Sequence, residues 1–214
     1  MGYGVTGFFS NDPIYLSGTG YRLTTDPFAS QTWYHGHLPD PTSNDRGTFV
    51  SPDRLQIANA DRQYILQGWA SPVGGTEGNT GFTVTFSIRF TSLTATRWGG
   101  IAIFNKDWGF DDGQSNTSTG LNGYHFLFRT EGTLQCYKVT NGVATQLGGD
   151  VATAALAANN TYNMTLTVTP TGLSWARSGY TALTNSDTSY RGGYIYFSHR
   201  INPAQFFDVT VTDT

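Results

Sequence analysis

Alternation of apolar and polar residues is clearest between Phe82 and Phe90, where every second side chain is apolar. A period of two predicts a β-strand with one face in a core and the other in water. Residues 162–168 repeat the pattern, and residues 207–211 place Phe207, Val209 and Val211 on one predicted core face. The chain therefore contains several strands that are apolar on one side.

A second pattern begins at Trp98, where apolar residues become continuous. The apolar runs 99–104 and 123–128 flank a polar, aspartate-rich insertion from Lys106 to Gly120, and a glycine turn at Glu131-Gly132 follows. Aromatic and β-branched runs separated by glycine turns are typical of β-hairpins. We interpret the stretch as two long strands joined by an exposed loop, followed by a meander.

Helical patterns are almost absent. Residues 151–159, alanine-rich after Asp150, could form two helical turns at most. The one-sided strands must then be covered by another sheet, which predicts an all-β, two-sheet antiparallel β-sandwich, with a closed barrel as the alternative. We expect one such domain at residues 26–214. Residues 1–25 show no sustained periodicity and are assigned to an N-terminal arm or edge segment.

Composition agrees with this class and excludes some functions. Of 214 residues, 14% are aromatic and 13% charged, and the net charge is -3. Because the chain has no excess of positive charge, we expect no binding to nucleic acid or to an anionic membrane. We recognise no signal peptide and no transmembrane segment in the sequence. Cys136 stands alone, which excludes a disulfide within the chain, and its mid-strand position predicts a small buried side chain.

The order of strands and turns resembles the concanavalin A-like lectin/glucanase superfamily, particularly its laminin-G-like and bacterial or phage glycan-recognition domains. The likeness extends over roughly residues 28–213. It is carried by the segments Gly99–Phe104, Gly123–Phe128, Leu134–Val139, Thr161–Val168, Gly172–Trp175, Gly193–Phe197 and Phe206–Val211. The resemblance implies a jelly roll of two curved antiparallel sheets. It also implies that ligands bind on the concave face or at the rim loops, often beside a calcium ion.

Catalysis is not expected. Glycosidases of that superfamily carry acidic residues at alternating positions of one strand, whereas Glu77 and Glu131 lie in a loop and a turn. Glycoside hydrolysis needs two carboxyl groups held at a fixed separation. A polysaccharide lyase would need arginine, histidine, tyrosine and an amide on one concave face. Arg89, Arg129, His125, Tyr194 and Tyr196 leave this possibility open. We predict that the protein is not an enzyme, with a polysaccharide lyase or glycoside hydrolase as an alternative.

Two regions are candidates for sugar binding, because aromatic rings stack on pyranose faces and planar polar groups bond hydroxyls. The predicted ligand-binding residues are Asp107, Trp108, Asp111, Asp112 and Asn116 in the insertion, and Tyr194 and Tyr196 in a later strand. Asp111 and Asp112 are also candidate calcium ligands, since calcium takes six to eight oxygens. The alternative for the insertion is a solvated turn. Strand parity points both tyrosines away from the core, where a loop or another subunit could cover them.

Two functions fit these features. The first is a non-catalytic, lectin-like carbohydrate-binding surface module of a phage virion, as a tail or capsid decoration and attachment protein. Its partners would be a cell-surface glycan or polysaccharide and neighbouring virion subunits. The second is a purely structural virion assembly subunit in which residues 1–25 grip a neighbour. Both place the protein on a virion surface or outside the cell, and both are compatible with a homo-oligomer.

Overall fold

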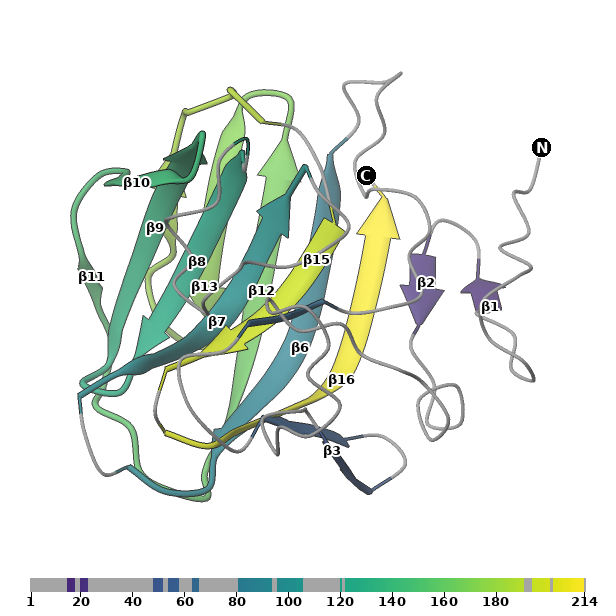
Figure 1. Ribbon diagram of the computed structural model, residues 1–214, viewed down its shortest axis with the longest axis vertical. Helices are drawn as coiled ribbons and strands as arrows, with labels where there is room; N and C mark the ends of the chain where they lie inside the picture. The colour runs from purple at the N-terminus through teal and green to yellow at the C-terminus, as the bar shows by residue number, and fades with distance from the viewer. Residues whose placement is uncertain are drawn as a thin grey trace.

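The protein is a sandwich of two antiparallel sheets in the computed structural model, as the sequence predicted (Figure 1). The structure describes residues 81–93, 96–105, 120, 122–190, 194–200 and 202–213, together with five short strands before residue 66. None of these described residues lies in an α-helix.

The back sheet has the order β1-β2-β16-β6-β12-β13-β14, and β4 pairs with both β16 and β3. Its strands are β1 (Tyr15–Ser17), β2 (Gly20–Arg22), β3 (Thr48–Ser51), β4 (Arg54–Ile57), β6 (Phe82–Phe90), β12 (Thr161–Thr169), β13 (Gly172–Arg177), β14 (Leu183–Asn185) and β16 (Ala204–Asp213). The segment predicted as an N-terminal arm thus contributes β1 and β2, which lie beside β16 at one end of this order.

The front sheet has the order β10-β9-β8-β7-β15-β5, and β11 pairs with β9. Its strands are β5 (Gln63–Ile65), β7 (Trp98–Phe104), β8 (Gly123–Arg129), β9 (Thr133–Thr140), β10 (Val143–Gln146), β11 (Val151–Ala152) and β15 (Tyr194–His199). In Figure 1, β7, β8, β9 and β15 form the layer in front of β6, β12 and β13.

The core lies between the two sheets. The apolar residues of β6, including Phe82, Phe86 and Phe90, are buried there together with Cys136. Trp175 crosses the core from the back sheet and donates its indole N–H to the carbonyl oxygen of Leu127 in the front sheet, at 3.0 Å. Burial of each large apolar side chain stabilises the fold by about 1.5–3 kcal/mol. The two sheets therefore share one apolar interior.

Residues 151–159, for which two helical turns were the upper limit, contain none and begin with the short strand β11. One local expectation was wrong. The predicted alternation from Phe207 to Val211 is broken, because Asp208 has a φ of 53° and the register of β16 against β6 shifts there. Phe206 and Val209 consequently lie in the core. Phe207 lies instead beneath the guanidinium of Arg54, 4.2 Å from the ring centre.

Candidate functional site

The front sheet presents a mixed aromatic and polar surface on the side away from the core. Register and alternation place on this outer face Trp98, Ala102, Phe104, His125, Leu127, Arg129, Gln135, Tyr137 and Tyr196. Residues between them, such as Ile103 and Phe126, belong to the core between the sheets. The outer face therefore collects aromatic rings, amides and a guanidinium from four adjacent strands.

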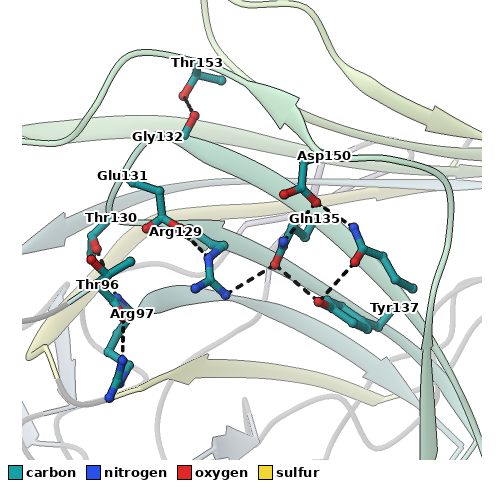
Figure 2. A network of polar contacts seen from close by, with 11 residues as sticks. Thr96, Arg97, Arg129, Thr130, Glu131, Gly132, Gln135, Tyr137, Asp150 and Thr153 are labelled. Atoms are coloured by element: carbon teal, nitrogen blue, oxygen red, sulfur yellow. Dashed lines mark hydrogen bonds and ion pairs between the residues drawn. The ribbon is translucent and has the colours of Figure 1, made fainter.

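Six polar residues at the β8–β9–β10 side form a connected network, which we call the polar strip: Arg129, Glu131, Gln135, Tyr137, Gln146 and Asp150 (Figure 2). Arg129 Nε donates to Glu131 Oε1 at 2.6 Å. The amides of Gln135 and Gln146 both donate to Asp150 Oδ1, at 2.9 and 2.6 Å. The Tyr137 hydroxyl lies 3.4 Å from Gln135 Oε1. Each polar group is thus oriented by a neighbour rather than by solvent alone.

The polar strip is accessible at its rim and fixed at its centre. Gln135 is buried, whereas Gln146 and Asp150 are exposed and Tyr137 is half-buried. Burial raises the pKa of Tyr137, so the phenol keeps its proton and remains a hydrogen-bond donor at neutral pH. Planar amide, guanidinium and carboxylate groups beside an aromatic ring are the groups that bind sugar hydroxyls and pyranose faces. The strip therefore has the chemistry of a carbohydrate-binding surface.

Further along the outer face, the side chains are buried. Tyr196 has the predicted orientation away from the main core, yet its side chain is 0% exposed and packs with Ala102, Phe104 and Val139 in a second apolar cluster. Its ring centre lies 5.7 Å from that of Phe104. A ligand could contact the Tyr196 side chain only if the groups that bury it moved away. Its role as a ligand-binding residue remains a prediction.

The other predicted site residues lie largely outside the described part of the chain. Asp107, Trp108, Asp111, Asp112 and Asn116 fall in a range that the structure does not describe. For Tyr194, only the backbone is described, and it pairs with Phe104 at the start of β15. No cluster of three or more potential metal-ligating acids, histidines or cysteines occurs among the residues that are described. The calcium prediction is thus untested.

The structure does describe the base of the insertion, where asparagine side chains connect its two ends. Asn105 Oδ1 accepts from the Asn122 backbone N–H at 2.8 Å, and Asn105 Nδ2 donates to the Gly120 carbonyl at 3.2 Å. Asn141 Oδ1 accepts from the Gly120 N–H at 2.6 Å, which ties the β9–β10 turn to the same point. Tyr190 donates its hydroxyl to Asn122 Oδ1. The insertion therefore starts and ends on a hydrogen-bonded base at one end of the outer face.

A second polar cluster lies next to this base. Asp187 accepts hydrogen bonds from the Tyr124 hydroxyl and from Lys138 Nζ, the latter at 2.8 Å. Burial by itself would raise the pKa of Asp187, but the hydrogen bonds from Lys138 and Tyr124 outweigh it and lower the pKa. Burial and the bond to Asp187 raise the pKa of Tyr124. Asp187 therefore stays ionised and holds the 187–190 segment against β8 and β9.

The residues considered for a lyase are brought together only in part, since Tyr196 lies with His125 and Arg129 on one face and Arg89 does not. Arg129 and His125 share the outer face of the front sheet, whereas Arg89 lies on the outer face of the back sheet and donates to Gln205 Oε1. His125 is 3% exposed, and its Nε2 lies 2.9 Å from Ser198 Oγ. Burial lowers the pKa of His125 to about 3, which keeps the ring neutral. The imidazole is bonded to Ser198 and packed against Trp98.

Comparison with known proteins shows the fold. No family model and no curated protein sequence matches the chain. The solved structures that resemble it include the carbohydrate-binding module CBM66 from Bacillus subtilis, with a TM-score of 0.57, 14% identity, and coverage of 84% of this chain and 94% of that one. The Emp47p carbohydrate recognition domain has a TM-score of 0.59 at 11% identity, and the match covers 85% of this chain and 88% of that one. A putative glycosyl hydrolase from Parabacteroides distasonis has a TM-score of 0.53 at 8% identity, and the match covers 88% of this chain and 90% of that one.

These likenesses, together with the two antiparallel sheets, define the class. The chain has the two-sheet jelly-roll fold that these solved structures share, and its sequence predicted this fold. Within the described residues, no helix has the length and hydropathy needed to cross a membrane.

Most of the polar strip was missed by sequence reasoning. Gln135, Gln146 and Asp150 are ordinary polar residues in the sequence, and only strand pairing brings Gln146 opposite Tyr137. One signal was available, because Gln135 and Tyr137 alternate with the apolar Leu134 and Cys136 in a predicted strand. That alternation predicts a polar outward face.

Proposed function

We propose that this protein is a non-catalytic carbohydrate-binding module that holds a glycan against the outer face of its front sheet. The observation that carries the proposal is the polar strip, in which two amides, a guanidinium and a carboxylate are oriented around the half-buried ring of Tyr137. Pre-oriented groups lose less conformational entropy on binding than mobile ones. The likeness to carbohydrate-binding domains agrees with this use of the fold.

Each group has a role in the proposed site. The Tyr137 ring offers an apolar face to a pyranose, and Asp150 accepts hydrogen bonds from sugar hydroxyls. Gln146, exposed beside Asp150, can both donate and accept. The predicted residues Asp107, Trp108, Asp111, Asp112 and Asn116 would extend the site from the opposite end of the same outer face, with calcium at Asp111 and Asp112 as part of the proposal.

Binding is favoured over catalysis by the environment of the ionisable groups. Glu131 is paired with Arg129 at the surface, and Asp150 is held by two amides. Glycoside hydrolysis needs two carboxyl groups directed at the scissile bond, whereas one oxygen of each of these carboxylates is bonded to a protein donor. His125 is buried and neutral. These surroundings support the non-catalytic alternative among proteins of this fold.

The test is binding to a glycan array, followed by calorimetry on the glycans that are retained. We expect Tyr137→Ala to weaken binding at least tenfold, because it removes the stacking ring. Tyr180→Ala is the matched control, since Tyr180 is another solvent-accessible tyrosine but lies in the β13–β14 connection of the back sheet. Titrations with calcium and with a chelator, in the wild type and in Asp111→Ala, test the metal. Trp108→Ala tests the insertion.

The outcomes separate the alternatives. Equal binding by the two tyrosine variants would place the site elsewhere, and the absence of any bound glycan would support a structural subunit. Release of reducing ends or unsaturated sugars from a polysaccharide would show catalysis. Each variant is checked for an unchanged melting temperature, so that loss of folding is not taken for loss of binding.

We further propose the setting in which the module works, namely the surface of a phage particle, where it attaches to host glycans beside other virion subunits. Among the described strands, β1 lies at the end of the back sheet, and this position supports an assembly contact, because an edge strand leaves backbone groups available for pairing with a neighbour. Identification of the protein by mass spectrometry in purified particles, and self-assembly that is lost when residues 1–25 are removed, would support this setting.

A further inference from the structure

Strand pairing places an arginine beside a tryptophan on the outer face of the front sheet. Trp98 in β7 is the register partner of Arg129 in β8. Side chains of directly opposed residues in neighbouring antiparallel strands point to the same face, with Cβ atoms about 4.5–5.5 Å apart. Arg129 also contacts Gln135, a member of the polar strip. The strip therefore continues into an indole at this end of the sheet.

The indole is held in a defined orientation. The rings of Trp98 and His125 meet edge to face, with centres 4.9 Å apart and an interplanar angle of 86°. His125 is itself fixed by Ser198 on the next strand but one. Trp98 is only half-buried, so part of its surface remains accessible. It offers a second aromatic surface for a sugar, beyond that of Tyr137.

The guanidinium of Arg129 keeps bonding capacity for a ligand. Its side chain is 27% exposed, and its Nε is paired with Glu131, whose side chain is 39% exposed. Its Nη1 lies 3.4 Å from Gln135 Oε1, beyond the usual 2.7–3.2 Å of an N–H···O bond. A guanidinium binds a carboxylate through two parallel hydrogen bonds, which is stronger than a single neutral contact. A ligand carboxylate can therefore compete with these two partners.

The chain as a whole carries a net charge of -3, and two further arginines lie next to the backbone of Trp98. Arg97 precedes Trp98 in the chain, and Arg200 donates its backbone N–H to the Trp98 carbonyl at 2.8 Å. At the insertion end of the same sheet, Lys138 is neutralised by Asp187. Arg129 is therefore the charged group of the polar strip that lies opposite an accessible indole.

We propose that the Arg129–Trp98 pair is a subsite for the acidic ring of a carboxylated polysaccharide. This inference rests on the proposed glycan-binding function and specifies its ligand class as a polysaccharide that contains uronic acid. The uronate carboxylate binds the Nη groups of Arg129, and the apolar face of the ring packs on Trp98. Glu131 occupies part of the guanidinium when no ligand is bound and so lowers affinity for the anion.

The experiment compares each acidic polysaccharide with its own methyl ester, which has the same backbone without the charge. Calorimetry is performed with polygalacturonate, alginate and hyaluronan, each as acid and as ester. We expect at least one acid to bind ten times more tightly than its ester, and added salt to reduce the difference. Arg129→Gln should remove this preference. Glu131→Gln should increase affinity for the acid.

Arg89→Gln is the matched control. Arg89 is also half-buried in a long strand and hydrogen-bonded to a glutamine, but it lies on the back sheet. It should leave the preference unchanged. If acids and esters bind equally, if only neutral glycans bind, or if Arg129→Gln retains the preference, the acidic subsite is overturned while glycan binding itself stands. If no glycan binds at all, the proposed function fails as well.

Discussion

The two outer faces of the sandwich are built differently. On the back sheet, threonines of three neighbouring strands lie in register in two rows: Thr212, Thr83 and Thr167 in one, and Thr210, Thr85 and Thr165 in the other. All six are half-buried or exposed. On the front sheet, the outward side chains of His125, Leu127 and Phe104 are buried. One face therefore meets solvent through hydroxyls, and the other is partly covered.

This difference corresponds to two patterns in the sequence. A strand that alternates apolar and polar residues has one face in water, whereas a continuous apolar run is typical of a strand covered on both faces. Apolar and polar residues alternate in β6, whereas β8 is a continuous apolar run. The burial of their side chains agrees with these patterns: Thr85 is exposed, whereas both Phe126 and its neighbour Leu127 are buried. The front sheet thus exposes polar groups mainly at its β9–β10 side, where the polar strip lies.

Substitution of adjacent residues in β6 should give the largest contrast. Phe86→Ala should lower the free energy of unfolding by about 3–5 kcal/mol, because it opens a cavity among Trp175, Phe197 and Phe206. Thr85→Ala should change it by less than about 1 kcal/mol. Urea unfolding measures both, from the midpoint at constant slope. Similar losses for the two variants would contradict the assignment of β6 as one-sided.

The same test on the outer face of the front sheet should give a different result. Leu127→Ala should cost about 2–4 kcal/mol, close to a core substitution, because the side chain is buried on that face as well. The backbone carbonyl that accepts from Trp175 is retained in this variant. Unfolding is again followed in urea, with Thr85→Ala as the comparison. A loss below about 1 kcal/mol would mean that this face is effectively exposed to solvent.

Sequence patterns predicted the sandwich because alternation depends only on local geometry. β6 and β12 pair with each other along their length as one-sided strands, as their periods indicate. The bulge at Asp208 was missed, because one residue in a left-handed conformation shifts register without changing composition. The polar strip was missed for another reason: Gln135 and Asp150 are fifteen residues apart and meet only after β9 and its partners pair. The residues predicted in the insertion remain untested.

The burial of the front sheet's outer face can also be tested through the pH dependence of stability, since His125 is buried on that face. Its pKa is lowered by burial to about 3, against an ordinary value of 6.5. Between these values the unfolded chain binds a proton that the folded protein does not. The stability contributed by the neutral ring is therefore complete above about pH 6.5 and is lost as the pH falls toward 3. The expected loss is about 1.4 kcal/mol per pH unit within this window.

The control is His125→Gln, which keeps a hydrogen-bonding group toward Ser198 but does not titrate. Carboxylates also destabilise the folded state in acid. Asp187, whose pKa is lowered once the bonds from Lys138 and Tyr124 outweigh burial, contributes to this loss in both proteins. The difference in slope between wild type and variant, measured by urea unfolding at several pH values, isolates the histidine. Equal slopes would mean that His125 is protonated without cost, which requires an outer face open to water.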